Sequence, residues 1–174
     1  MAVKGMVRRP HYDPDKGLAA GILLEMDAPD ELAISFQYDL WANLQWLACL
    51  QSKAENAVDL AVLGHSLSAQ KVWVLRCNGH SLDHMPQVEV SESAMRALNA
   101  EWMEVIERIQ DNPTIHYRRS TGEALSSTFR DIALHVINHS TYHRGELRGL
   151  RRSKQDSDFP ETDRIGYTLH VAPK

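Results

Sequence analysis

The chain has 174 residues, 43% of them hydrophobic and 24% charged, so it can bury the core of one domain and leaves little room for extensive disorder. Its formal net charge is −4, and its lysines and arginines form no long stripe with interleaved aromatics, which argues against a nucleic-acid partner. No segment reaches the roughly 18 apolar residues that span a bilayer, and Cys49 and Cys77 form no disulfide framework, so we expect one cytoplasmic domain, residues 1–174, without a membrane partner.

The first two predicted helices each carry a polar residue inside an apolar stripe. Residues 1–28 form an N-terminal extension with weak periodicity, and their structure is left open. A helix is predicted over about 30–52, with Asn43 inside its apolar face. A second is predicted over about 54–77 and ends at Asn78 and Gly79, with a face made of Val58, Val62, His65, Ala69, Val72 and Trp73.

The remaining elements complete a bundle. A third helix begins near residues 91–93 and ends before Pro113, and "TIHYRR" at 114–119 reads as a short extended segment followed by a turn. A fourth helix is predicted over about 124–152, with Leu125 and Phe129 on its apolar face, and a short closing helix follows Pro160. Four amphipathic helices with mostly short connections predict an all-α four-helix bundle.

Three histidines recur every four residues in the fourth helix, in "HVINHSTYHRGEL". On a helical wheel His143 lies inside the apolar arc and His139 at its margin, whereas His135 falls about 40° further out. Imidazoles at i and i+4 can converge on one cation, although this spacing is also common in helices without a metal. His65 can supply a third imidazole, and three neutral imidazoles with an open position would form a catalytic site for Zn²⁺, Ni²⁺ or another late first-row ion.

Two further polar residues, Asn43 and Glu146, have more than one interpretation. Asn43 could hold the second nitrogen of a ligand histidine or satisfy a helix-end carbonyl, or it could be a core asparagine that specifies helix register. Glu146 could accept a hydrogen bond from a ligand histidine or act as a general base, or it could be an ordinary solvated carboxylate. Trp73 is expected to line a pocket at the site.

Four segments in order resemble motifs of the DinB/YfiT-like metalloenzyme family: "DLWANLQWL" (39–47), "LGHSLSAQKVW" (63–73), "DIALHVINHSTYHRGEL" (131–147) and "PETDRIGYTL" (160–169). The resemblance implies a DinB-like four-helix bundle with a metal bound by His65, His139 and His143. It further implies that Asn43, Asn138 and Arg144 support the site and that His135 is not a ligand.

The family resemblance also shapes the expected activity. Characterised relatives include transferases and isomerases that use bacillithiol, mycothiol or glutathione, and homodimers are frequent. Compared with the family pattern, this chain has Glu146 where glutamine is common, and it has a longer N-terminal segment.

Three functional hypotheses follow. The first is a metal-dependent hydrolase or thiol S-transferase that acts on a small molecule, because a divalent ion lowers the pKa of bound water toward about 7 and deprotonates a bound thiol. The second is a non-catalytic metal-binding or stress-response protein. The third is a structural bundle whose histidines are satisfied by hydrogen bonds.

Overall fold

The structure is a computed structural model that describes residues 28–171 apart from residues 55 and 120. All of the N-terminal extension except residue 28 lies outside this range. The elements in chain order are α1 (Ala28–Gln51), α2 (Ala57–Cys77), α3 (Glu92–Arg108), β1 (Thr114–Arg118), β2 (Ala124–Thr128), α4 (Phe129–Ser153) and α5 (Arg164–His170).

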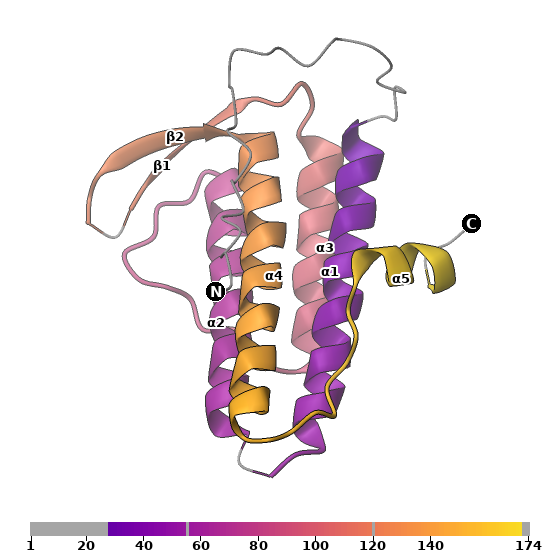
Figure 1. Ribbon diagram of the computed structural model, residues 1–174. Helices are drawn as coiled ribbons and strands as arrows, with labels where there is room; N and C mark the ends of the chain where they lie inside the picture. The colour runs from indigo at the N-terminus through magenta and orange to yellow at the C-terminus, as the bar shows by residue number, and fades with distance from the viewer. Residues whose placement is uncertain (1–27, 55, 120, 172–174) are drawn as a thin grey trace, which may run out of the picture.

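Helices α1 to α4 form a bundle in which α1 packs mainly on α3 and α2 mainly on α4 (Figure 1). Helices α1 and α4 run in one direction and α2 and α3 in the other, so residues 78–91 form a long connection that returns along the bundle before α3 begins. The all-α bundle predicted from the sequence is confirmed. Within the described range no helix is long and apolar enough to cross a membrane.

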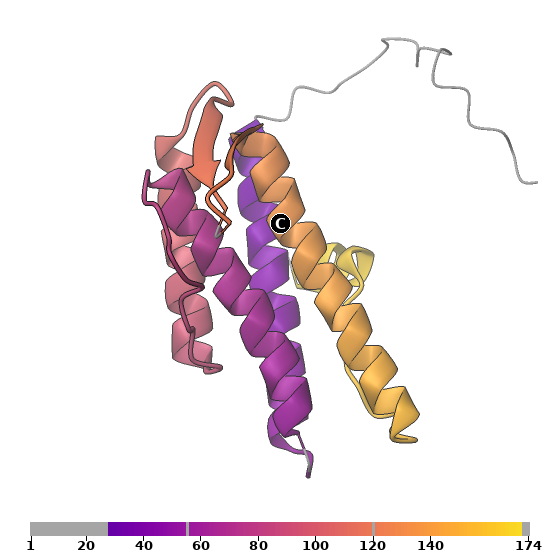
Figure 2. The same ribbon diagram turned by 90° about the vertical axis from the view of Figure 1, so that its left-hand side faces the viewer.

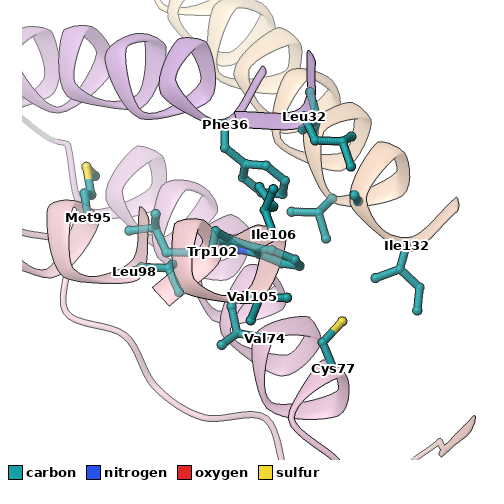
Figure 3. Packing of buried hydrophobic residues seen from close by; sticks show 14 of the residues in the cluster. Leu32, Phe36, Val74, Cys77, Met95, Leu98, Trp102, Val105, Ile106 and Ile132 are labelled. Carbon is teal, nitrogen blue, oxygen red and sulfur yellow. The ribbon is translucent and has the colours of Figure 1, made fainter. Parts of the chain in front are cut away.

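The core lies between the four helices and is filled by large side chains. Phe36 of α1 and Trp102 of α3 stack with ring centroids 4.4 Å apart, and both are almost fully buried (Figure 3). Offset stacking of this kind adds to the free energy gained from burying the rings. Ser91 caps α3 by accepting a hydrogen bond from the backbone N–H of Ala94, as its position in the sequence suggested.

The start of α4 differs from the prediction. Residues 124–128 form β2 and pair in antiparallel register with β1, so that Leu125 lies opposite Tyr117 and is 36% exposed instead of facing the core. The helix begins at Phe129, where the Thr128 side chain caps it by accepting from the backbone N–H of Asp131. Helical spacing alone placed Leu125 on the wheel, and the pairing of residues 124–128 with the preceding strand β1 overrides it.

The predicted apolar face of α2 was wrong in part, because Val62 and Trp73 pack against the core but most of the core side is made by other residues. The core side of α2 consists of Leu63, Leu67 and Val74 together with the polar residues Ser66 and Gln70. Val58 is 61% exposed and His65 is exposed. Apolar residues occur on both sides of α2, so periodicity could not choose between them. Four residues of the predicted face border a cavity: His65, Ala69, Val72 and Trp73.

The closing helix after Pro160 is confirmed as α5, which packs across the outer side of α1 (Figures 1 and 2). Tyr38 of α1 contacts Tyr167 of α5 edge to face, with centroids 5.7 Å apart, and its hydroxyl donates to the Thr162 carbonyl at 2.8 Å. These contacts hold the segment after α4 against the bundle.

A buried charge cluster joins the end of α4 to the start of α2. Asp59 is fully buried and accepts from Arg151 Nη1 at 3.2 Å and from Lys154 Nζ at 2.7 Å. Arg151 also binds Asp156 through Nη2 at 2.6 Å. The hydrogen bonding of the Asp156 carboxylate to Arg151, more than any other influence, lowers the pKa of Asp156 to about 2.

This pKa predicts how stability depends on pH. Because the folded-state pKa lies below the unfolded value of about 3.9, ionised Asp156 stabilises the fold above about pH 4, and the contribution disappears as pH falls through about 2. We therefore expect Asp156→Asn to be less stable than wild type at pH 6 and the difference to close near pH 2. Urea denaturation of both proteins across this range measures it. A difference that stays constant with pH would contradict the assignment.

Candidate metal centre

Three histidine side chains from α2 and α4 converge on one point. His65, His139 and His143 each offer one ring nitrogen, and the three nitrogens all lie within 4.8 Å of one another. The Nε2 atoms of His139 and His143 are 3.2 Å apart. The ring centroid of His65 lies 5.6 Å from the ring centroid of His139 and 4.9 Å from that of His143.

This convergence follows from helix geometry and from helix pairing. His139 and His143 are four residues apart, so they project from adjacent turns of the same face. His65 meets them because α2 packs against α4, and the Ser66 hydroxyl donates to the Ser140 hydroxyl at 3.2 Å. Since these serines directly follow His65 and His139, their contact fixes the spacing of the two helices beside the cluster.

His135 lies one turn before His139 and outside the cluster. Its ring contacts Trp73 edge to face, with centroids 5.6 Å apart, and it is exposed. This position agrees with the helical wheel, which placed His135 beyond the other two rings.

Burial and neighbouring rings keep His139 uncharged at neutral pH. The pKa of His139 falls from 6.5 to about 4, mainly because burial disfavours the cationic form and further because His143, His135 and His65 are close. A neutral imidazole keeps a nitrogen lone pair for a metal ion.

Glu146 orients one of the candidate ligands. Its Oε2 lies 2.8 Å from Nδ1 of His143, three residues earlier on the same helix. When Nδ1 donates to this carboxylate, Nε2 is left as the lone-pair nitrogen and points at His139. A histidine held between a carboxylate and a metal is a recurrent arrangement in zinc proteins.

The donor set fits a late first-row divalent ion. At the usual Zn–N distance of about 2.0–2.1 Å, two nitrogens of a tetrahedral site lie about 3.4 Å apart, close to the 3.2 Å between His139 and His143. His65 completes a set of three imidazoles, and because His65 is exposed, an ion held by the three rings would be accessible to an outside ligand. Imidazole suits zinc and nickel alike, so the ligands do not choose between them.

Behind the histidines lies a buried polar network centred on Asp39 of α1. Arg144 donates to Asp39 Oδ1 and, at 2.9 Å, to Asn43 Oδ1. Gln70 Nε2 lies 2.8 Å from Asp39 Oδ2 and 2.9 Å from the Ser140 hydroxyl. The network therefore reaches the serine next to His139, and it ties α1, α2 and α4 together at the level of the site.

The residues predicted to support the site lie in different places. The side chain of Asn43 bonds to Asp39 and Arg144, and within the described part of the chain it bonds to no histidine. Arg144 is buried in the same network. Asn138, by contrast, is exposed.

A cavity of about 240 Å³ opens beside the cluster, between α2, α4 and the connection that precedes α3. Trp73 lines it, together with His65, Ala69, Val72, Arg76, Leu82, His84, Met85, His135 and His139. The connection packs closely on α2, because a Cβ added at Gly64 would meet Val90 at 3.1 Å and the Ser68 hydroxyl accepts from the backbone N–H of Val88. His65 and His139 of the cluster thus line a cavity that is large enough for a small molecule.

The comparison with protein families decides the assignment. The DinB family model matches residues 50–152, which is more than half of the chain and includes all three clustered histidines. The chain belongs to the DinB family. A search of curated proteins finds no match.

Sequence reasoning missed several residues around this DinB site. Asp39 lies four residues before Asn43, on the same side of its helix, and this spacing could have marked it as a partner. Gln70 and Ser140 gave no such signal, because their roles depend on how α2 and α4 pair with α1. Arg76 and His84 reach the cavity from the end of α2 and from the connection after it.

The Glu146 contact leads to a prediction for metal affinity. Removing a hydrogen-bond partner of a metal-bound histidine typically weakens binding about 10- to 100-fold, so we expect a loss of this size in Glu146→Ala. Competition titration of Zn²⁺ against a chromophoric chelator measures it. Glu104→Ala removes an exposed carboxylate from α3 and should leave the affinity unchanged. Equal affinities in both variants would show that Glu146 is only a solvated side chain.

Proposed function

We propose that this DinB protein is a metal-dependent enzyme that holds Zn²⁺ or Ni²⁺ with His65, His139 and His143. We further propose that it reacts water or a low-molecular-weight thiol with a small electrophile, as a hydrolase or thiol S-transferase. The observation that carries the proposal is the convergence of three imidazole nitrogens within 4.8 Å beside an open cavity. A divalent ion held there would lower the pKa of a bound water or thiol, so that a nucleophile exists at neutral pH.

The surrounding residues would divide the work between orientation and binding. Glu146 fixes the ring of His143, and the buried network of Asp39, Gln70 and Ser140 keeps α2 and α4 at a constant separation. The cavity beside Trp73 would hold the electrophile next to the ligands. In either reaction the oxygen or sulfur forms a bond to the electrophilic carbon, and the leaving group departs with the electron pair of the bond that breaks. The proton of the water or thiol passes to the leaving group or to solvent.

An open coordination position distinguishes an enzyme from a metal-sequestering protein. We would load the chelator-treated protein with Co²⁺ and record its visible spectrum while adding glutathione. A new sulfur-to-cobalt charge-transfer band, absent in His139→Ala, would support the proposal, as would metal-dependent consumption of p-nitrophenyl acetate or of 1-chloro-2,4-dinitrobenzene with glutathione. Tight Co²⁺ binding with a spectrum unchanged by thiol and no turnover would favour the non-catalytic metal-binding or stress-response alternative.

A further inference from the structure

The cavity beside the histidine cluster carries positive charge and no negative charge. Among its ten lining residues Arg76 is the one permanent cation, and none is an aspartate or glutamate. The remaining lining side chains are histidines and apolar groups. A cavity with this composition favours a ligand that has an anionic group near Arg76 and an apolar body elsewhere.

Arg76 is held in place by aromatic rings. Its guanidinium carbon lies 4.6 Å from the centroid of Trp73 and 4.9 Å from that of Tyr117. Nη2 donates to the backbone carbonyl of Arg118 at 3.1 Å. These contacts fix the orientation of the guanidinium without neutralising it, since neither π faces nor a carbonyl carries a formal negative charge.

The hydrogen-bonding capacity of Arg76 is largely unused. Nε is buried and has no partner, and no carboxylate within the described residues forms an ion pair with this side chain. Burial, the largest influence, lowers the pKa of Arg76 from its ordinary value. A partly buried cation without a counter-ion is costly, and an anionic ligand in the adjoining space would offset that cost.

The other walls favour an apolar ligand body. Trp73 and Val72 come from α2, and Leu82 and Met85 come from the connection after it. Arg76 follows His65 by eleven residues along α2, about 16 Å of helix rise, and the arginine side chain leans back over Trp73. The volume of about 240 Å³ limits the ligand to a small molecule.

We propose that this cavity selects small organic carboxylates with an apolar body, and that Arg76 is the residue that recognises the carboxylate. The ligand would lie with its apolar part against Trp73, Leu82 and Met85, and its other end would face His65 and His139. This inference rests on the proposed function for its chemical meaning, because the recognised carboxylate would be the substrate of the metal site. The recognition itself involves Arg76 and can be measured without metal.

A matched pair of probes tests the charge requirement. We would measure the dissociation constants of 3-phenylpropanoate and 3-phenylpropanamide at pH 8 by calorimetry, using the full chain both stripped of metal and loaded with Zn²⁺. A charge-assisted hydrogen bond predicts that wild type binds the carboxylate about 10- to 100-fold more tightly than the amide. Arg76→Gln should lose this preference and leave amide binding unchanged, and Arg76→Lys should keep part of it.

Arg118→Gln is the control for long-range charge. It removes the same charge from the neighbouring strand β1, keeps the backbone carbonyl that Arg76 contacts, and changes a side chain that lines a different hollow. Equal affinity for carboxylate and amide in wild type would overturn the proposal, even if Arg76→Gln failed to fold. If Arg76→Gln and Arg118→Gln lost the preference for carboxylate over amide to the same extent, the proposal would also be overturned. A carboxylate preference that persists without metal, and in His143→Ala, would support it even if the metal proposal failed.

Discussion

Replacing Arg144 with alanine is expected to lower the free energy of unfolding by about 3–5 kcal/mol. Arg144 forms an ion pair with Asp39 in which the side chains are 4% and 3% exposed, and it also donates to Asn43 and Thr141. Without Arg144, Asp39 would remain as a buried carboxylate supported only by the amides of Asn43 and Gln70. Urea denaturation at pH 7 measures the loss.

Two controls separate the buried pair from charge in general. Arg148→Ala removes an arginine one turn further along α4, whose pair with Glu161 is exposed, and should cost at most about 1 kcal/mol. The double variant Asp39→Asn with Arg144→Met should be more stable than Arg144→Met alone, because it leaves no unpaired buried charge. If Arg144→Ala were as stable as Arg148→Ala, the network could not be what holds the three helices together.

His143→Ala is expected to weaken Zn²⁺ binding by more than the 10- to 100-fold expected of Glu146→Ala, because it removes a ligand and not merely the partner of one. The chain would also lose metal-dependent stabilisation. A ligand that binds only the folded state at 100 times its dissociation constant stabilises by about 2.7 kcal/mol. Thermal unfolding with and without Zn²⁺, together with chelator competition, measures both effects.

His135→Ala is the matched control for this experiment. The residue lies on the same helix at the same four-residue spacing, but it belongs to the cavity wall and not to the cluster. Its replacement should leave Zn²⁺ affinity nearly unchanged. Equal losses in His135→Ala and His143→Ala would mean that metal binds to the histidine row of α4 without the geometry proposed here.

How far the sequence predicted the fold depended on how clear each helical face was. In α3 one stripe is apolar at helical spacing, and its residues Met95, Leu98, Trp102 and Ile106 are buried. In α2 both sides carry apolar residues, so the face was predicted only in part: Val62 and Trp73 pack against the core, but His65 is exposed. Of the hairpin, the sequence predicted β1 as an extended segment but assigned the residues of β2 to the fourth helix. The reason is that β2 continues directly into α4 and its hydrophobic residues fit the helical spacing of α4.

At the site too, the features set by spacing within one helix could be predicted, and the contacts between separate segments could not. The spacing of His139 and His143 follows from one helix, and His65 was singled out as a polar residue inside a predicted apolar stripe and then by the family resemblance. Which side chains would surround them depended on the approach of separate segments. The network from Asp39 through Gln70 to Ser140 joins three helices, and Arg76 meets the cavity only because Leu82, His84 and Met85 fold back beside α2.

X-ray absorption spectroscopy of the protein loaded with one equivalent of Zn²⁺ tests the central claim most directly. Three imidazoles sharing one ion predict three nitrogen ligands at about 2.0–2.1 Å with imidazole outer-shell scattering, and at least one further light ligand. One imidazole fewer is expected in His65→Ala. A wild-type spectrum with one histidine or none, or a spectrum that His65→Ala leaves unchanged, would contradict a metal centre formed by α2 and α4.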